Sequence, residues 1–372
     1  MSVRSPLMNE WEHKLANCVT LNMIGTVARR FARPAQNHSN AGTTPTKRGA
    51  LMLDVIIRGG TVVDGTGAKA FRADVGIQGN RIEHIGDLAQ AEAADVLDAA
   101  GLCVSPGFID MHSHSDLALL EDPRGLSKLH QGVTTELVGQ CGFSPFPLTG
   151  RYRAIPEATL QTAFTTSLRS VDWTDLAGYA ERINRQGSSI NVAPLVGHVP
   201  VRAAVLGYDE RAPTEDELEQ MRRLLAQDME QGAFGLSTGL TLVPSAYAES
   251  HEVVELAKVA AAYDGLYDTH GRFWAGRQYK GAEEAAETGR LAGVRVQVSH
   301  LAIIDPRYHG QPERLTEVFE GALAAGVDIA YDVYPYVASG SMLSQFLPGW
   351  AQEGGAPQMV ARIRDPETRR RI

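Results

Sequence analysis

Short apolar runs separated by turn-forming residues mark the first ordered part of the chain. Between residues 52 and 104, the stretches DVIIRGGTVV, ADVGIQGNRIEHIG and ADVLDAAGLCV are rich in β-branched residues and are interrupted by glycine, asparagine and aspartate. Runs of this kind are typical of strands joined by tight turns. The pattern therefore predicts a small β-sandwich-like domain over residues 52–104.

From residue 105 onward, apolar strands alternate with helical segments. The predicted strands are GFIDMHSH (107–114), VTTELVG (133–139), INVAPLVGH (190–198), AFGLSTGL (233–240), GLYDTHGR (265–272), VRVQVSHL (294–301) and VDIAYDVYPY (327–336). The clearest helix signal begins with Thr214 and Glu217 at the spacing of a capping box and ends at Gly232. Strands that alternate with helices indicate a parallel α/β fold.

Two parallel folds compete for this pattern. A (β/α)₈ barrel needs eight strands and places its functional residues at the carboxyl ends of the strands. A doubly wound open sheet would carry a glycine-rich phosphate loop after its first strand, and the nearest stretch, GLSTGL, matches no such motif. We therefore expect residues 105–372 to form a TIM-like (β/α)₈ barrel that is C-terminally incomplete, with about seven strands.

Residues 1–51 differ from the rest of the chain. The stretch VARRFARPAQNHSNAGTTPTKRGA is basic and polar, and it lacks the apolar core of a secretory signal. We interpret residues 1–51 as a disordered leader or as translated sequence upstream of a start at Met52, with an arginine-rich transit peptide as a less supported alternative.

The composition of the chain argues against several classes of protein. The net charge of −9 comes without a Lys/Arg stripe, which argues against nucleic acid as a partner. No apolar run approaches the ~20 residues of a membrane span. The three cysteines are too few and too scattered for a disulfide framework. We expect a cytoplasmic protein that acts on a small molecule, and the sequence leaves the oligomeric state open.

Histidines recur where predicted strands end. The four that do so most clearly are His112, His114, His270 and His300. Side chains at positions i and i+2 of a strand share a face, so two of these imidazoles could meet one ion beside Asp110. A hydrogen-bonded core histidine is the commoner explanation for any one of them, but four at one rim of a barrel favour a metal site. His198 ends a further strand and could support the ligands, face the substrate or be structural.

Cys141 ends the second predicted strand unit, in LVGQCGFSP. Gly139 and Gly142 on either side of it indicate a tight turn. A buried, inert cysteine is one interpretation. The other is a zinc ligand, because a thiolate binds zinc strongly, can bridge two ions and is deprotonated by the metal itself.

Together these motifs resemble the amidohydrolase superfamily and, more narrowly, the N-acyl-D-amino-acid deacylase (D-aminoacylase) family. The resemblance extends from about residue 53 to residue 350. It implies a metal-dependent (β/α)₈ barrel flanked by a small β-domain, with one or two Zn²⁺ ions. Carried over residue by residue, it implies the following ligands: His112 and His114 at one position, Cys141 at both, and His270 and His300 at the second.

Lysine usage agrees with a bridging cysteine. Many other amidohydrolases bridge their metals with a carbamylated lysine. The lysines of this chain are Lys14, Lys47, Lys69, Lys128, Lys258 and Lys280. None of them ends an apolar barrel strand, which favours Cys141 as the bridge and argues against hydantoinase or dihydroorotase relatives.

The resemblance also implies a reaction, the hydrolysis of the amide bond of N-acyl-D-amino acids to a carboxylate and a free amino acid. The family's catalytic residue is an aspartate at the end of the eighth strand, which would lie beyond Ile372. Asp110 matches a first-strand aspartate that supports the histidines. Asp332 does not match the catalytic position, so it is interpreted as a hydrogen-bonding partner or a structural residue.

The sequence differs from the family pattern at Ala302. Relatives usually carry a lysine at this position, which could hold the substrate carboxylate. We therefore consider Arg272 and Arg202 as substrate-binding candidates, because a planar guanidinium suits a carboxylate, together with His198. Either arginine could equally be a solvated surface residue.

Other functions stay open at this point. One is a truncated homologue that binds zinc without turnover, and another is a related D-dipeptidase or acyl-amide hydrolase. An open barrel exposes a strand edge. We therefore expect the chain alone to be less stable than a version extended through strand eight, or to represent an incomplete gene model.

Overall fold

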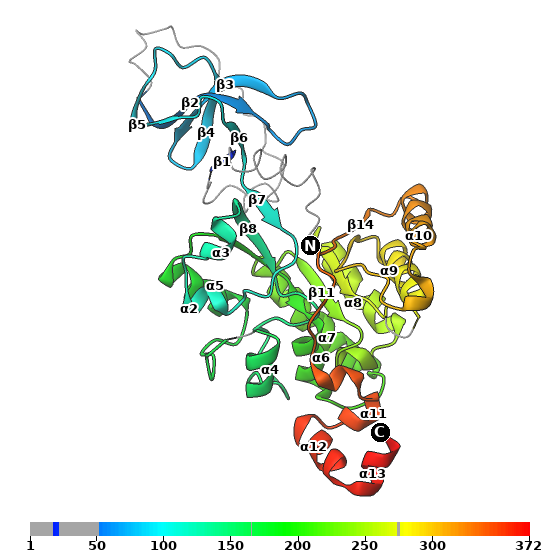
Figure 1. Cartoon of the computed structure of the whole chain (residues 1–372). Helices are drawn as coiled ribbons and strands as arrows, with labels where there is room; N and C mark the ends of the chain where they lie inside the picture. The colour runs from blue at the N-terminus through cyan, green and yellow to red at the C-terminus, as the bar shows by residue number, and fades with distance from the viewer. Residues whose placement is uncertain (1–17, 22–51, 165, 274–275) are drawn as a thin grey trace, which may run out of the picture. The chain divides into compact units, whose positions relative to one another are not determined.

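The computed structural model describes residues 18–21, 52–164, 166–273 and 276–372 of the 372-residue chain (Figure 1). These residues divide into two compact units. The first unit contains the described residues up to Ile109, with Gly125–Thr135 and Ser189–Asn191. The second unit contains Asp110–Arg124, Glu136–Ser188 and Val192–Ile372.

A six-stranded sheet dominates the first unit. Its strands are β1 (Cys18–Leu21), β2 (Met52–Val62), β3 (Phe71–Gln78), β4 (Arg81–Gly86), β5 (Glu92–Asp98) and β6 (Cys103–Pro106). They pair in the order β1-β6-β2-β3-β4, and β5 also pairs with β2. The turn from β3 to β4 uses Gly79 at a φ of +58°, a conformation that glycine adopts without strain. The predicted sandwich arrangement and the boundaries at residues 52 and 104 stay predictions.

Part of the predicted leader is a strand. β1 pairs in parallel with β6, from Cys18 opposite Cys103 to Leu21 opposite Pro106. The backbone groups of Cys18–Leu21 thus join a sheet, and the interpretation of residues 1–51 as a leader or as upstream translated sequence stays a prediction. Its remainder, residues 1–17 and 22–51, lies outside the described residues.

The predicted strands after residue 105 are present in two sheets. The bounds are β7 (Phe108–Asp110), β8 (Val133–Val138), β9 (Asn191–Pro194), β10 (Val196–Gly197), β11 (Gly235–Gly239), β12 (Leu266–His270), β13 (Arg295–Val298) and β14 (Ile329–Tyr331). Strands β7, β8 and β9 form a three-stranded sheet, and β10 to β14 form a five-stranded sheet in chain order. All four pairings of the five-stranded sheet are parallel.

Only Leu195 separates β9 from β10, and its N–H donates to Val138 O at 2.9 Å. The two short strands therefore make up the single predicted strand at 190–198.

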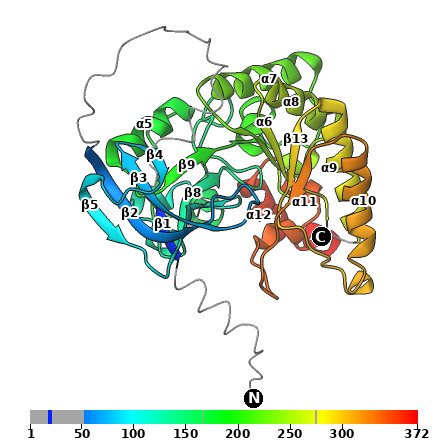
Figure 2. The same cartoon turned by 90° about the horizontal axis from the view of Figure 1, so that it is seen from above.

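Helices alternate with the strands of the second unit. The long ones are α5 (Leu176–Gln186), α6 (His198–Leu206), α7 (Glu215–Glu230), α8 (Ser250–Ala262), α9 (Gln278–Ala292) and α10 (Glu313–Ala324). The helices α7 to α10 pack side by side along the outer side of the five-stranded sheet (Figure 2). The capping box predicted for α7 is confirmed, because the Thr214 side chain accepts from Glu217 N and the Glu217 side chain accepts from Thr214 N.

The core of the second unit lies between this sheet and its helices. Leu218, Met221, Leu225 and Met229 line the buried face of α7, and Leu236, Val296 and Val298 come from the strands. This arrangement follows from the sequence, since apolar residues three or four apart share one helix face and a sheet covered by helices needs apolar strands.

The remaining helical elements complete the described chain. They are α2 (Ala118–Glu121), α3 (Leu126–Leu129), α4 (Glu157–Thr162), η2 (Ser245–Tyr247), η3 (Pro306–Tyr308), η4 (Leu343–Phe346), α11 (Gly349–Gln352), α12 (Ala356–Arg364) and α13 (Pro366–Arg371). Among the helices of the described residues, none has both the length and the apolar character that crossing a membrane requires.

Candidate metal centre

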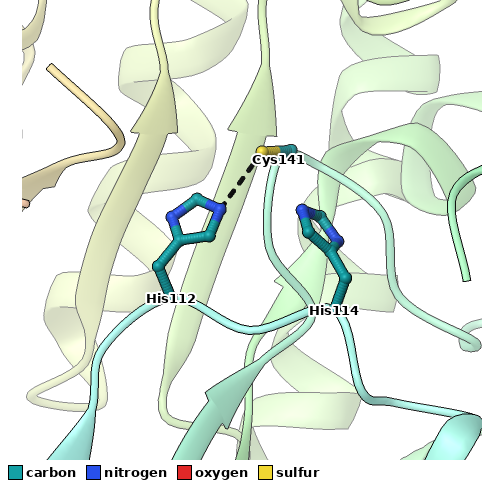
Figure 3. Close-up of side chains that lie close together, drawn as sticks. All are labelled: His112, His114 and Cys141. Atoms are coloured by element: carbon teal, nitrogen blue, oxygen red, sulfur yellow. Dashed lines mark hydrogen bonds between the residues drawn. The ribbon is translucent and has the colours of Figure 1, made fainter. Parts of the chain in front are cut away.

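His112 and His114 lie in the loop that follows β7, not within the predicted strand. The strand ends at Asp110, whose side-chain Oδ1 accepts a hydrogen bond from His112 N at 3.1 Å. Gln140 Nε2 donates to Met111 O at 2.9 Å and holds the backbone of the same loop. Both imidazoles point toward Cys141 (Figure 3).

Cys141 occupies a strained turn after β8. Its φ is +54°, a conformation that a non-glycine residue adopts at a cost, and such strain is concentrated at functional sites. A Cβ atom at Gly139 would lie 2.3 Å from Leu195 O, and one at Gly142 would lie 2.6 Å from Gly239 N. The glycines predicted to make a tight turn are therefore required here by close backbone contact as well as by conformation.

His270 and His300 come from the next two strands of the five-stranded sheet. His270 is the last residue of β12, and Thr241 Oγ1 lies 2.7 Å from its Nε2. His300 follows β13 at a φ of +37°, and its N–H donates to Asp332 Oδ1 at 2.6 Å. This hydrogen bond holds the strained backbone that directs the imidazole toward Cys141.

The five predicted ligands are brought together in two overlapping sets. One set is His112, His114 and Cys141, and the other is Cys141, His270 and His300; in each, the donor atoms lie within 4.8 Å of one another. Cys141 Sγ lies 3.6 Å from His112 Nε2 and 3.5 Å from His300 Nε2. A single thiol is therefore shared by two three-donor sets.

The chemistry of these donors fits zinc or a similar metal. Zinc is bound by imidazole nitrogen and thiolate sulfur, and catalytic sites use three protein ligands. Among the described residues, the buried Nδ1 atoms of His114 and His270 have no hydrogen-bond partner. A buried polar atom without a partner is costly, so these nitrogens indicate a ligand that belongs to the site.

Electrostatics favour neutral imidazoles at three of the positions. Burial, and then the charge of His112, lowers the pKa of His114 to about 4 and that of His300 to about 4. Burial also lowers the pKa of His270 well below its usual value. A neutral imidazole keeps the lone pair that a metal requires.

His112 behaves differently. Burial lowers its pKa, but Asp332 and then Cys141 outweigh that effect and raise the pKa to about 11. The same burial raises the pKa of the Cys141 thiol. The field at His112 therefore favours positive charge, and a metal cation would meet the same field.

Two buried carboxyl groups beside the ligands were missed at the sequence level. Asp268 lies two residues before His270 on β12, is fully buried, accepts from Ser299 Oγ at 2.5 Å, and has its pKa raised by burial to about 7. Asp116 is also fully buried; its Oδ1 accepts from Gly139 N at 2.7 Å, and burial raises its pKa to about 7. Asp116 thus ties the loop of His112 and His114 to the turn of Cys141.

The alternation of side chains along the strand LYDTH could have indicated that Asp268 lies near the site, because Asp268 and His270 share one face of the strand. No comparable signal marks Asp116, whose partner Gly139 is recognisable only in the folded chain.

A cavity of about 900 Å³ opens over both donor sets. The five donor residues, Asp110 and Asp332 line it on the polar side. The apolar lining includes Met111, Phe143, Leu242, Phe273, Ile304 and Met342. This size and this mixture of apolar walls with a few convergent polar groups are typical of small-molecule sites.

The predicted substrate-binding residues Arg202, Arg272 and His198 are not among the residues that line this cavity, and their role stays a prediction. Arg202 is fully buried, and its Nε donates to Glu252 Oε1 at 3.0 Å. Arg272 forms an ion pair with Glu284 at 2.6 Å. Each guanidinium already has a carboxylate partner from the chain itself, which leaves it unsuited to hold a substrate carboxylate.

His198 lies among buried side chains and is not one of the residues that line the cavity. It begins α6 and is fully buried, with Ser245 Oγ 2.7 Å from its Nδ1 and Glu252 Oε1 2.8 Å from its Nε2. The order Ser–His–Glu resembles a hydrolase triad. Ser245 is also fully buried, so a substrate could not reach its hydroxyl.

Comparison with known proteins identifies the class to which this fold and site belong. Residues 95–372 match the model of the Amidohydrolase family. The chain therefore belongs to the amidohydrolase family.

Within the family, the chain is similar to several individual deacylases. The N-acyl-D-glutamate deacylase of Alcaligenes xylosoxydans xylosoxydans is 40% identical over 293 residues, which are 78% of this chain. The crystal structure of N-acyl-D-glutamate deacylase from Bordetella bronchiseptica, complexed with zinc and a phosphonate inhibitor, matches 76% of this chain with a TM-score of 0.71 and 38% identity. A D-aminoacylase structure with a binuclear metal centre matches 77% of it with a TM-score of 0.71 and 36% identity.

The matched part is shorter than these relatives. The chain spans 58% of the length of the Alcaligenes deacylase and 59% of the length of each of the two solved structures.

Proposed function

We propose that this chain carries out zinc-dependent hydrolysis of the amide bond of N-acyl-D-amino acids, releasing a carboxylate and a free amino acid. The observation that carries the proposal is the pair of overlapping donor sets that share Cys141 on the wall of a substrate-sized cavity. The similarity to N-acyl-D-glutamate deacylase and D-aminoacylase supports the substrate class, including the D configuration.

Five side chains would hold the metal. His112, His114 and Cys141 form one position, and Cys141, His270 and His300 form the other. Zinc at such a site polarises an amide carbonyl and lowers the pKa of a water molecule toward about 7.

The chain's own residues orient these ligands and shape the cavity. Asp332 and Asp116 hold the loops of the ligands through hydrogen bonds to His300 N and Gly139 N. The apolar lining receives the acyl group or side chain of the substrate and limits the access of bulk water, which strengthens electrostatic interactions inside. The eighth-strand aspartate expected to transfer the proton from water to the departing amine stays a prediction.

Hydrolysis of a panel of N-acetyl-D-amino acids tests the proposal directly. The purified chain is incubated with each compound and its L enantiomer, and the free amine released is quantified. We expect release from D substrates, loss of release after treatment with a chelator, and recovery when zinc is restored.

Two results would count against the proposal in different ways. Zinc binding without amine release would favour the non-catalytic zinc-binding alternative. Release that is unaffected by removal of all bound metal would exclude the zinc-dependent reaction.

A further inference from the structure

We propose that Asp332 is a positioning residue that fixes the orientation and tautomer of His112, so that the His112 Nε2 lone pair faces Cys141, and that it joins the two donor sets through His300. This inference rests on the proposed function only in assuming that the donor sets bind metal. It concerns the side chains of this chain and the polar contacts between them.

The position of Asp332 follows from the sheet. β14 ends at Tyr331, which is paired with Val298, the last residue of β13. The next residue along each strand then leaves the sheet, and Asp332 N donates to Val298 O at 3.1 Å while Leu301 N donates to Asp332 O at 2.8 Å. Asp332 is therefore held by backbone bonds on both sides, directly beside His300.

The two carboxylate oxygens of Asp332 face different partners. Oδ1 accepts from His300 N at 2.6 Å. Oδ2 accepts from Gln297 Nε2 at 3.0 Å and lies 3.6 Å from His112 Nδ1, a charge contact slightly longer than a hydrogen bond. One carboxylate thus reaches a residue from each of the two donor sets.

The negative charge of Asp332 beside His112 Nδ1 favours one tautomer of His112. An ionised carboxylate can only accept hydrogen bonds, so the ring nitrogen that faces it is the one that carries the proton. The proton of a neutral His112 then lies on Nδ1, and Nε2, 3.6 Å from Cys141 Sγ, keeps its lone pair. Carboxylates that orient metal-binding histidines in this way affect metal affinity by 10–100-fold when they are removed.

Asp332→Asn separates this role from the support of the His300 backbone. The amide oxygen can still accept from His300 N, so the strained backbone at His300 is kept. The amide nitrogen then faces Gln297 and His112 as a donor, which favours a proton on the wrong ring nitrogen of His112. Only the position that contains His112 should weaken.

Metal titrations of four proteins and one control variant test this inference. They are the wild type, Asp332→Asn, His114→Ala, and the double variant His114→Ala with Asp332→Asn. Asp328→Asn is the matched control, because Asp328 has an exposed side chain four residues earlier in the chain. Zinc affinity is measured by competition with a chromophoric chelator, and the visible absorption of the Co²⁺ forms reports the ligand geometry.

We expect Asp332→Asn to weaken one zinc position by about 10–100-fold and to alter its Co²⁺ spectrum, while Asp328→Asn leaves both unchanged. In the His114→Ala background, which already lacks one ligand of that position, Asp332→Asn should add less than about threefold. Unchanged affinity in Asp332→Asn, or equal weakening of both positions, would overturn the inference.

A second variant covers the case in which Asp332→Asn does not fold. Gln297→Leu removes the amide that holds Asp332 Oδ2 and leaves the carboxylate and all five metal donors in place. We expect a smaller weakening, confined to the same position, and unchanged binding would overturn the inference. If the wild-type chain bound no zinc at all, the proposed function would fail and the inference with it.

Discussion

At the scale of single residues, the account depends most on Cys141, because its sulfur belongs to both donor sets. The thiol lies 3.6 Å and 3.5 Å from imidazole nitrogens of the two sets. If one imidazole were removed, a water molecule could take its place at that metal position. The loss of the shared sulfur would affect both metal positions at once.

Replacement of this thiol should remove most of the bound metal. We expect Cys141→Ser to lower the affinity of both positions by at least tenfold, because a neutral hydroxyl is a far poorer zinc ligand than a thiolate. Cys103→Ser is the matched control, since Cys103 is a free cysteine on β6 in the first unit. Zinc content after dialysis measures the effect, and equal zinc content in the two variants would contradict the role of Cys141.

The glycine before this turn provides a second test at the residue scale. Gly139 and Gly187 share a φ of +80°, but an added Cβ meets Leu195 O at 2.3 Å only at Gly139 and has nothing within 4 Å at Gly187. We expect Gly187→Ala to lower the free energy of unfolding by about 1–2 kcal/mol, the usual cost of this conformation, and Gly139→Ala to lower it by clearly more. Chemical denaturation measures both, and equal losses would show that backbone contact at Gly139 adds nothing.

Much of the site could be predicted from single residues, but not all of it. The proximity of His270 and His300 could be predicted because each closes an apolar run, and a parallel sheet brings such ends to one edge. The partner of Arg202 could not be predicted, because Glu252 lies 50 residues away in the sequence and only packing brings the two together. Burial of Asp268 and Asp116 likewise depends on elements that a strand pattern does not reveal.

At the scale of elements, the sequence predicted helix ends best where side chains form hydrogen bonds to nearby backbone groups. The capping box of α7 was predictable because Thr214 and Glu217 bond to groups three residues away. Strand ends were less predictable: His112 and His114 leave the sheet because Asp110 and Gln140 hold the loop backbone. Long-range hydrogen bonds of this kind have no fixed sequence spacing.

The contact between α7 and α5 predicts a pH effect on stability. Asp228 on α7 is almost fully buried, its Oδ1 accepts from Leu176 N at 3.1 Å, and burial raises its pKa from 3.8 to about 7. The folded state therefore holds this proton over a pH range in which the unfolded state has lost it. The stability contributed by Asp228 falls as the pH rises from about 4 to about 7 and is constant above that.

Asp228→Asn should remove this pH dependence. The amide still accepts from Leu176 N and carries no charge, so we expect the variant to gain stability relative to the wild type as the pH rises from 4 to 7. Thermal unfolding at several pH values measures this, with Asp216→Asn, an exposed position on the same helix, as control. A difference between variant and wild type that does not change with pH would contradict the raised pKa.

At the scale of the whole molecule, the metal ligands connect distant parts of the second unit. They come from the loops after β7 and β8, from the end of β12 and from the turn after β13. A cation held by all of these segments would stabilise the folded state of that unit without any change in its core. The mixed α/β fold was predictable from the alternation of patterns, whereas closure of the barrel stays a prediction.

Zinc should therefore raise the thermal stability of the chain. Ligand at 100 times its dissociation constant adds about 2.7 kcal/mol to the free energy of unfolding when it binds only the folded state. We expect the midpoint of thermal unfolding to fall on treatment with a chelator and to recover with Zn²⁺ but not with Mg²⁺, which prefers oxygen ligands. A midpoint that is indifferent to zinc would show that the five donors do not act together.

X-ray absorption at the zinc edge tests the central claim most directly, because it reports the atoms that surround the ion. With one equivalent of zinc bound, we predict a sulfur neighbour at about 2.3 Å together with imidazole nitrogens at about 2.0–2.1 Å. A zinc ion surrounded only by oxygen and nitrogen, with no sulfur contribution, would contradict the assignment of Cys141 and its neighbouring histidines as the metal centre.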